Sequence, residues 1–407
     1  MSWNVHPRIL WQGALLALAV GAISCGGSSS HKNNLPIPSS GANVQTVVVN
    51  GGPENNYANG IFTSLTVCVP STSSCQTINN VLVDTGSYGL RLLSSTGGGA
   101  LTLSLPTQNG THGNPMGECA EFVSGFTWGR VVTADVKIAS EQASGVPVQV
   151  IDQTFAAVPT SCSGAGIPEQ DTIQKLGAEG ILGVGPFVQD CGGACTQSGS
   201  TNPGVYYECA STSCQAAVEP IAQQVSNPVG LFATDNNGVI LELPALSSPA
   251  PTVDGSLIFG IGTESNNGLN DASVYPMNAS AEFSTSYSGH NYPGFVDSGS
   301  NGLFFPNAQP SSVPPCPSPN NSFYCPASTA NLSATISSPG GPSTPINFSV
   351  SNADSLFSSS GNFAFPTLAG PDPGTFDWGL PFFFGRNVYT AIDAHSTPGG
   401  QGPYWAF

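Results

Sequence analysis

The amino-acid sequence predicts a mainly all-β protein built from two related halves. The prediction rests first on two similar stretches, residues 81–93 (V-L-V-D-T-G-S-Y-G-L-R-L-L) and 294–306 (G-F-V-D-S-G-S-N-G-L-F-F-P). When Asp84 is aligned with Asp297, the neighbouring Val, Gly, Ser, Gly and Leu residues coincide. Two such copies, each led by an apolar strand and separated by about half of the 407-residue chain, indicate an internal duplication.

Composition is the second observation. The chain has 49 Gly and 35 Pro but only 8% charged residues, which is typical of strands joined by many polar turns. A hydrophobic fraction of 39% argues against global disorder. Patterns typical of amphipathic helices are scarce, and residues 171–177 and 215–225 are the best helix candidates.

In chain order, an apolar run from Ile9 to Ile23 follows Arg8 and precedes Cys25. This resembles a bacterial lipoprotein signal, in which the Cys becomes the lipidated first residue; an ordinary secretory signal is the alternative. Gly26 replaces the Asp that signals inner-membrane retention, so a lipid anchor in the outer membrane of the bacterial cell envelope is expected.

The segments that follow are distinguished by composition. Residues after Cys25 are rich in Gly, Ser, Asn and Pro, which predicts a flexible tether. Strand patterns begin at Val44 and recur at 61–69 and 77–83, and the last of these leads directly into Asp84. The predicted segments are a signal peptide at 1–24, a tether at 25–43, an N-terminal lobe at 44–225 and a C-terminal lobe at 226–407.

The charge balance excludes one class of partner. Seven Lys and Arg stand against 24 Asp and Glu, which gives a formal net charge of −17. A nucleic-acid partner is not expected, because the chain has few cations with which to neutralise phosphates.

Ten cysteines remain after Cys25, an even number that suits disulfides in an oxidising compartment. Connectivity is not fixed by the sequence alone. The pairings considered are Cys68–Cys75, Cys119–Cys162 and Cys316–Cys325, with Cys191, Cys195, Cys209 and Cys214 clustered in one long loop. Zinc is the alternative for that cluster, but its C-x3-C and C-x4-C spacings without a nearby His are atypical. We therefore expect no metal and no cofactor.

Each repeated motif delivers a carboxylate at the end of a strand. The following Gly lets the chain turn back, and backbone N–H groups and hydroxyls of the turn can hold the carboxylate. Two such turns, related by a pseudo-twofold axis, would set Asp84 and Asp297 side by side, where they share one proton. The ionised member can deprotonate water while the protonated member polarises a carbonyl. The expected supporting residues are Thr85, Gly86, Ser87, Ser298, Gly299 and Ser300.

This arrangement resembles the pepsin-like aspartic peptidases. Residues 178–185 (A-E-G-I-L-G-V-G) are similar to the segment that packs behind that family's first catalytic loop, and residues 254–262 to the strands that open its second lobe. Residues 377–393 are similar to its closing segment. The resemblance implies a bilobal acid-protease fold with two pseudo-twofold-related β-barrel-like lobes. The G-L-P-F-F-F-G-R stretch also resembles a group of functionally uncharacterised bacterial lipoproteins.

Two departures from the peptidase pattern concern the surroundings of the pair. The family has a Tyr on a flap hairpin over the cleft, whereas the matching region 119–129 has none, and Arg91 stands near the position of a common Trp. The candidates for covering the cleft are Phe122, Phe126 and Trp128, of which only Trp128 can donate a hydrogen bond.

The closing segment contains the third departure. Where the peptidase family has Ile-Leu-Gly, the expected equivalent in this sequence is Gly379-Leu380-Pro381. Since Pro supplies no N–H, the packing behind the second Asp loop is expected to differ.

The function indicated is an envelope-anchored, monomeric aspartic endopeptidase that hydrolyses peptides or unfolded proteins between its lobes. The alternative is a catalytically inactive pepsin-fold lipoprotein that binds or inhibits a peptide or protein. The retained pair of Asp-[Thr/Ser]-Gly-Ser motifs favours the enzyme, and the altered flap favours the alternative. A structural surface protein would leave the doubled carboxylates unexplained, and no His has the sequence context of a serine hydrolase.

The N-terminal motif generates a prediction about the envelope. Cells expressing the wild-type chain should incorporate a labelled fatty acid into the protein, and Cys25→Ala should lose that label because no thiol remains to be acylated. The measurement is fluorescence of the labelled band after electrophoresis, with Cys68→Ala as the matched control. Label retained in Cys25→Ala would refute the assignment.

Overall fold

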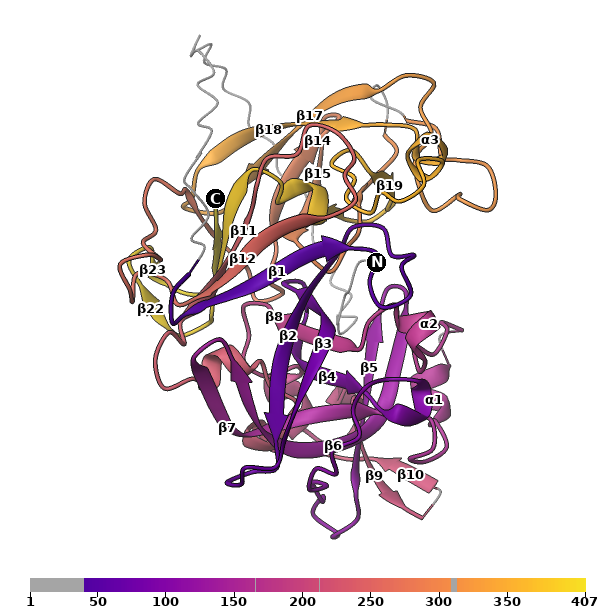
Figure 1. Ribbon diagram of the computed structural model, residues 1–407, viewed down its shortest axis with the longest axis vertical. Helices are drawn as coiled ribbons and strands as arrows, with labels where there is room; N and C mark the ends of the chain where they lie inside the picture. Colours follow the sequence, from indigo (N-terminus) through magenta and orange to yellow (C-terminus); the bar gives the residue numbers. More distant parts are fainter. Residues whose placement is uncertain (1–39, 165, 212, 309–312) are drawn as a thin grey trace.

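The computed structural model describes residues 40–164, 166–211, 213–308 and 313–407 (Figure 1). The predicted signal peptide, Cys25 and nearly all of the predicted tether lie outside the described residues. Strands account for 44% and helices for 9%, which confirms the mainly β class. No helix of the described ranges combines the length and the apolar character that crossing a bilayer requires.

Six strands of the N-terminal half close into a barrel, drawn in the lower part of Figure 1. Their order is β6–β7–β4–β8–β3–β2, and β2 pairs back onto β6. Val, Ile and Leu side chains on the inner faces of these strands form the core. The strands are β2 (Gly60–Cys68), β3 (Cys75–Asp84), β4 (Tyr88–Leu93), β6 (Gly125–Ile138), β7 (Glu141–Ile151) and β8 (Gly180–Val184).

A seven-stranded sheet in the C-terminal half repeats the barrel's arrangement without closing. Its strands follow the order β17–β14–β15–β20–β16–β19, which matches β6–β2–β3–β8–β4–β7 of the barrel strand for strand. The parallel and antiparallel pairs are also the same. The two halves therefore share one strand topology. The strands are β14 (Phe283–Tyr287), β15 (His290–Val296), β16 (Leu303–Phe305), β17 (Ala330–Ser337), β18 (Ser343–Val350), β19 (Ala369–Pro371) and β20 (Phe376–Trp378).

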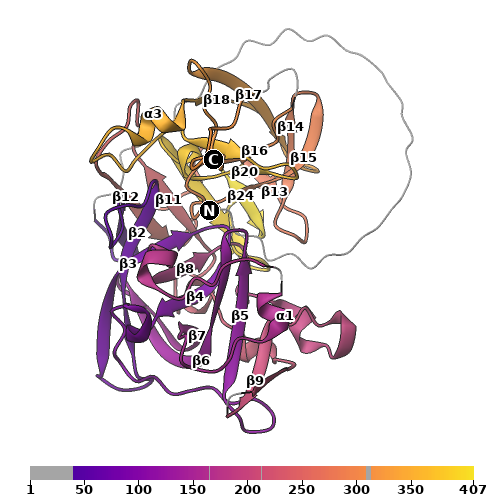
Figure 2. The same ribbon diagram turned by 90° about the vertical axis from the view of Figure 1, so that its right-hand side faces the viewer.

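Antiparallel strands between the halves extend the barrel sheet toward the second half. β1 pairs with both β2 and β12, and β11 continues the sheet to β21. The view in Figure 2 keeps the barrel below these strands and β14 to β18 above them. The linking strands are β1 (Val44–Asn50), β11 (Gly238–Leu243), β12 (Val253–Phe259), β13 (Val274–Pro276), β21 (Arg386–Ala391) and β24 (Tyr404–Ala406), and a separate pair is formed by β22 (Ser396–Thr397) and β23 (Gly400–Gln401).

A hairpin extends the barrel sheet on its other side. β5 (Met116–Phe122) pairs with β6 and with β9 (Tyr206–Ala210), which pairs with β10 (Ser213–Ala216). The predicted helix at 215–225 is wrong, because residues 215 and 216 belong to β10, which the disulfide Cys209–Cys214 ties to β9, and residues 221–223 form only a 3-10 turn. The predicted lobe boundary at 225/226 falls between β10 and β11.

Helices are short and few in the described ranges. The candidate at 171–177 is confirmed as a single turn, α2 (Ile173–Leu176), capped by the Thr172 hydroxyl. The remaining helices are α1 (Thr160–Ser163), α3 (Ala353–Phe357) and the 3-10 turns η1 (Ser95–Gly97), η2 (Gly192–Thr196), η3 (Gly199–Thr201), η4 (Ile221–Gln223), η5 (Pro228–Leu231) and η6 (Leu380–Phe382).

Five disulfides connect the ten cysteines of the described ranges. The three pairings considered from the sequence are confirmed, and the four clustered cysteines pair with their near neighbours in sequence, so their thiols are not available as zinc ligands. The bonds are Cys68–Cys75, Cys119–Cys162, Cys191–Cys195, Cys209–Cys214 and Cys316–Cys325.

Asn59, just before β2, joins the two halves through its side chain. The amide donates to the carbonyl oxygens of Asn301 at 2.8 Å and Phe365 at 2.9 Å, and it accepts from the Phe365 N–H at 2.6 Å. Asn59 is buried and has a φ of 54°, a left-handed conformation that Asn tolerates better than most residues. Its side chain therefore satisfies three backbone groups of the C-terminal half, two of them in buried contacts.

Asn59→Ala should lower the free energy of unfolding by about 3 kcal/mol, because it leaves those backbone groups without their partner. The measurement is urea denaturation followed by tryptophan fluorescence. Asn55→Ala is the matched control, since Asn55 has a φ of 57° but is exposed. Equal losses in the two variants would mean that backbone conformation, and not the contact between halves, accounts for the effect.

Candidate active site

The loops that follow β3 and β15 meet between the two halves. A Cβ atom added at Gly86 would lie 2.5 Å from Cγ of Asp297, and one at Gly299 would lie 2.7 Å from Cγ of Asp84. Only glycine lets each loop approach the carboxyl group of the other so closely. The two aspartates that the sequence repeat predicts as a pair are therefore brought together.

Reciprocal hydrogen bonds hold the two loops against each other. Thr85 Oγ1 donates to the Val296 carbonyl at 3.2 Å and accepts from the Ser298 N–H at 2.9 Å. Ser298 Oγ donates to the Val83 carbonyl at 2.7 Å and accepts from the Thr85 N–H at 3.1 Å. Thr85 and Ser298 were expected to hold the carboxylates, and their role is corrected here, because their hydroxyls bond to the opposite loop's backbone.

The carboxyl groups are held by the residues that come after these hydroxyls. Asp84 accepts from the Gly86 N–H at 2.8 Å and from Ser87 Oγ at 2.6 Å. In the second loop, Asp297 accepts from the Gly299 N–H at 2.8 Å and from Ser300 Oγ at 2.9 Å. Both aspartates are fully buried. The two loops thus repeat one hydrogen-bonding pattern.

Burial decides the protonation of the pair. It raises the pKa of Asp84 well above its usual range, and the negative charge of Asp297 raises it further. Burial also raises the pKa of Asp297, but hydrogen bonds from Asp84 and Ser300 act in the opposite direction. The arrangement therefore favours a proton on Asp84 that is donated to an ionised Asp297. Burial and the two carboxyl groups also raise the pKa of Tyr57 and of Tyr88, so both phenols stay neutral.

Strand register corrects the expected equivalence of the closing segment. β3 and β8 pair in parallel with Leu82 opposite Ile181, and β15 and β20 pair in parallel with Phe295 opposite Asp377. Since Leu82 and Phe295 each lie two residues before the paired aspartates, Asp377 occupies the position of Ile181. The segment Asp377-Trp378-Gly379, and not Gly379-Leu380-Pro381, therefore replaces Ile-Leu-Gly.

Asp377 is a site residue that the sequence reasoning missed. Its side chain is fully buried, and Oδ2 lies 2.5 Å from Ser300 Oγ, the hydroxyl that also contacts Asp297. Burial raises the pKa of Asp377 well above its usual range, and the charge of Asp297 contributes further. The sequence did contain a signal for this residue, because Asp377 is the single acidic residue in the short run F-D-W-G-L, whose five residues are all buried.

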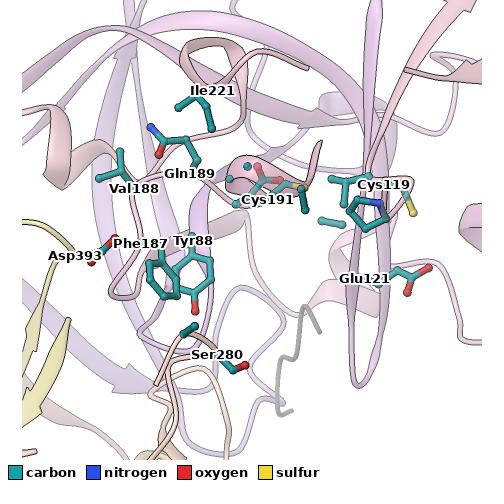
Figure 3. A pocket seen from close by; sticks show the side chains of 18 of the residues that line it. Tyr88, Cys119, Glu121, Phe187, Val188, Gln189, Cys191, Ile221, Ser280 and Asp393 are labelled. Atoms are coloured by element: carbon teal, nitrogen blue, oxygen red, sulfur yellow. The ribbon is translucent and has the colours of Figure 1, made fainter. Parts of the chain in front are cut away.

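Two pockets border the paired loops. One, of about 720 Å³, is lined from the first half by Tyr88 and Phe187 and from the second by Ser280 and Asp393 (Figure 3). The other, of about 510 Å³, is lined by residues that include Tyr57 and Asn301. Tyr88 and Asn301 come directly after the two Asp-[Thr/Ser]-Gly-Ser motifs, so each pocket lies next to one of the loops, while the aspartates themselves line neither pocket.

The wall of the larger pocket contains a buried ionic network. Arg91 Nη2 lies 2.5 Å from Glu118 and 3.4 Å from Asp190, while its Nη1 donates to the Tyr88 carbonyl at 2.8 Å. Asp190 also accepts from the Tyr206 hydroxyl at 2.6 Å. Burial, followed by the charge of Glu118, raises the pKa of Asp190 well above its usual range. This network fixes the β5 strand against the loop that carries Asp190.

Side chains of the β5–β6 hairpin separate according to the alternation of its strands. Trp128 and Phe126 pack in a cluster with Tyr207 and the Cys119–Cys162 disulfide, and the Trp128 ring N–H donates to the Ala156 carbonyl. They do not cover the aspartates, so that prediction is wrong for both. Phe122 lies on the opposite face, where its ring packs near Arg91 in a cluster with Tyr57.

The raised pKa values of Asp84, Asp190 and Asp377 predict a protein that is most stable in acid. Each of these groups keeps its proton to a higher pH in the fold than in the unfolded chain, where it ionises above about pH 4, so the folded state binds more protons. The free energy of unfolding should therefore fall as the pH rises from 4 toward 8. Each group contributes about 1.4 kcal/mol per pH unit until its own folded pKa is reached.

Urea denaturation across that pH range measures the slope. Asp377→Asn should make it shallower, because an amide does not titrate, and the exposed Asp354→Asn serves as the matched control. A free energy of unfolding that rises from pH 4 to pH 8 would contradict the assigned protonation states.

Comparison with known proteins gives a family but no activity. No curated protein matches the chain. A family model matches residues 39–407, which includes both Asp motifs and all of the strands described above. The chain thus belongs to the family described as "Protein of unknown function (DUF3443)".

Proposed function

We propose that this protein is an aspartic endopeptidase with a pepsin-like bilobal fold, in which Asp84 and Asp297 activate a water molecule for peptide-bond hydrolysis. The observation that carries the proposal is the reciprocal seating of the two Asp loops. Each carboxyl group lies against the glycine of the other loop and takes the same two hydrogen bonds from its own loop. A structural role alone would not require two acidic side chains to be buried in contact.

The repeated strand order supports the pepsin-like fold. In both halves, the strand that delivers the aspartate is flanked by an antiparallel neighbour and by a parallel one, β2 and β8 in the first half and β14 and β20 in the second. Such a repeat gives each carboxyl group an equivalent support. The closed barrel and the half-barrel then form the two lobes.

The protonation pattern assigns the chemical roles. Asp297, ionised, takes a proton from water as the water oxygen attacks the carbonyl carbon of the scissile bond. Asp84, protonated, donates its hydrogen bond to the carbonyl oxygen and stabilises the negative charge that develops there. Collapse of the tetrahedral intermediate breaks the C–N bond, and the proton held by Asp297 passes to the leaving amine. The pair ends with one proton, as it began.

The pockets support an extended substrate. A peptide segment lying across the pair would fill the space beside Tyr88 on one side and the space beside Tyr57 on the other. A folded substrate would not present its backbone in this way, so we propose a peptide or an unfolded protein. The chain acts as a monomer held at the envelope through acylated Cys25, needs no cofactor and does not bind nucleic acid.

A catalytically inactive peptide-binding or inhibitor lipoprotein is the second candidate. It is favoured by the β5–β6 hairpin, the region that matches the peptidase flap in sequence, whose strand β5 presents Glu118, paired with Arg91, and no Tyr. A mobile flap with a phenol hydroxyl is therefore replaced by a strand fixed through a buried ion pair. Such a protein would bind the same extended segment without cleaving it.

The dyad mechanism predicts that Asp84→Asn and Asp297→Asn each abolish cleavage, since one carboxyl group cannot act as both base and acid. The double variant should lose little more than either single one, as expected for groups that act as a unit. Cleavage of an unfolded-protein library by the detergent-purified full chain, scanned from acid to neutral pH, measures the effect. A statine-containing peptide should inhibit, because its hydroxyl takes the place of the attacking water.

Asp135→Asn is the control, because Asp135 is a buried carboxyl group on β6 that accepts from the Ser71 and Gly145 N–H groups. Wild-type cleavage by either dyad variant would exclude the dyad as the catalyst. Absence of cleavage at every pH, together with binding of the statine peptide that Asp84→Asn weakens, would establish the binding protein instead.

A further inference from the structure

The two Asp loops differ in what lies behind their second hydroxyl. Behind Ser87 the residue at the equivalent strand position is the apolar Ile181, whereas behind Ser300 it is Asp377. Ser87 Oγ contacts the carboxyl group of its own loop at 2.6 Å. Ser300 Oγ lies 2.9 Å from Asp297 Oδ2 and 2.5 Å from Asp377 Oδ2. The second loop thus carries an additional acid that breaks the symmetry of the pair.

Counting protons at Ser300 limits the protonation of its two acidic neighbours. A serine hydroxyl has one hydrogen and can donate it to one carboxyl oxygen only. If Asp297 and Asp377 were both ionised, the other oxygen–oxygen contact would join two lone pairs at hydrogen-bonding distance. One of the two carboxyl groups must therefore be a neutral acid that donates to Ser300 Oγ.

The surroundings assign the neutral form to Asp377. Asp297 also accepts from the Gly299 N–H, which favours its ionised form. Asp377 is fully buried, and its Oδ1 has no hydrogen-bond partner among the described residues. A charge on Asp377 would therefore lie in the protein interior with one oxygen unsolvated, which costs far more than a neutral carboxyl group.

We propose that Asp377 is a positioning residue of the dyad, which donates a proton to Ser300 Oγ and thereby directs the Ser300 hydrogen to Asp297 Oδ2. This inference rests on the proposed peptidase function. The chain Asp377–Ser300–Asp297 stabilises the ionised form of Asp297 and not that of Asp84, because Ile181 provides no such donor to Ser87. Asp377 therefore selects which of two nearly symmetric aspartates is the base and which is the acid.

Few other charges face Asp377 in the described structure. β15 leads to Asp297, and the loop after β19 carries Asp372, whose negative charge acts in the same direction as that of Asp297. β16, which pairs with Asp377 through Phe304, carries no titratable group. Burial and both charges disfavour the ionised form, in agreement with the raised pKa of Asp377.

Two substitutions separate a neutral donor from an ionised carboxylate. In Asp377→Asn, the amide N–H can still donate to Ser300 Oγ, so the acid limb of the pH profile of kcat/KM should stay where it is. In Asp377→Ile, which copies Ile181, the donor is lost, and the limb should move to higher pH by about one unit as the Asp297 pKa rises. If Asp377 were instead ionised, both variants would remove a negative charge and move the limb to lower pH.

The pH-profile experiment has a matched control variant, and a second variant can replace Asp377→Ile. Glu242→Gln converts another buried carboxyl group, with a pKa raised to about 7 by burial, on β11 of the linking sheet, and it should leave the limb unchanged. If Asp377→Ile does not fold, Ser300→Ala replaces it, since that limb should move to higher pH and Asp377→Asn should then have no additional effect. Unmoved limbs in all variants, or a limb that moves to lower pH in Asp377→Asn, would overturn the proposal.

Infrared spectroscopy tests the same assignment without turnover. The wild-type protein at neutral pH should show the carbonyl stretch of a buried neutral carboxylic acid, one component of which is lost in Asp377→Asn and shifts in Ser300→Ala. If the wild type cleaves nothing yet Asp377→Asn loses a component of this band, the peptidase proposal fails while the neutral Asp377 stands. If no component is lost in Asp377→Asn, Asp377 is ionised and the inference is wrong.

Discussion

The reciprocal hydrogen bonds between Thr85 and Ser298 are the interaction on which the arrangement of this molecule depends. Each residue both donates to and accepts from the backbone of the opposite loop. Because these groups are fully buried, separating the halves would leave several donors and acceptors without partners. The contact therefore fixes the distance between two carboxyl groups that repel each other when ionised. Without these hydrogen bonds, the repulsion between ionised Asp84 and Asp297 would favour separation of the two loops.

Further contacts between the two halves support this arrangement of the loops. Asn59 satisfies backbone groups of Asn301 and Phe365, and β1 of the N-terminal half pairs with β12 of the C-terminal half within one sheet. The glycines at the loop tips then allow an approach that any Cβ atom would prevent. Backbone geometry thus holds the two carboxyl groups in contact. Burying these acidic groups costs free energy, which contacts elsewhere in the fold offset. A stability that declines toward neutral pH is the expected consequence.

The two halves share a topology but differ chemically around the loops. Across the equivalent antiparallel strand pairs, Arg91 faces Ile181 in the first half, and Phe304 faces Asp377 in the second. The first half therefore places a buried cation network beside the larger pocket, whereas the second places a buried acid behind its own loop. These differences make a symmetric frame asymmetric around the two loops, and in the proposed peptidase they would distinguish the base from the acid.

The sequence by itself determined the β class, the internal repeat, the two aspartates and the nearest disulfides. These features depend on local patterns, such as alternating apolar residues, glycines in turns and short cysteine spacings. The tertiary structure alone decided the contacts of Thr85, Asp377 and Trp128. A hydroxyl bonds to its own loop or to another one according to how the halves meet, and the face that Trp128 occupies depends on strand pairing. Asp377 lies 77 residues from Ser300 in sequence, and only the parallel register of β15 with β20 brings the two side chains together.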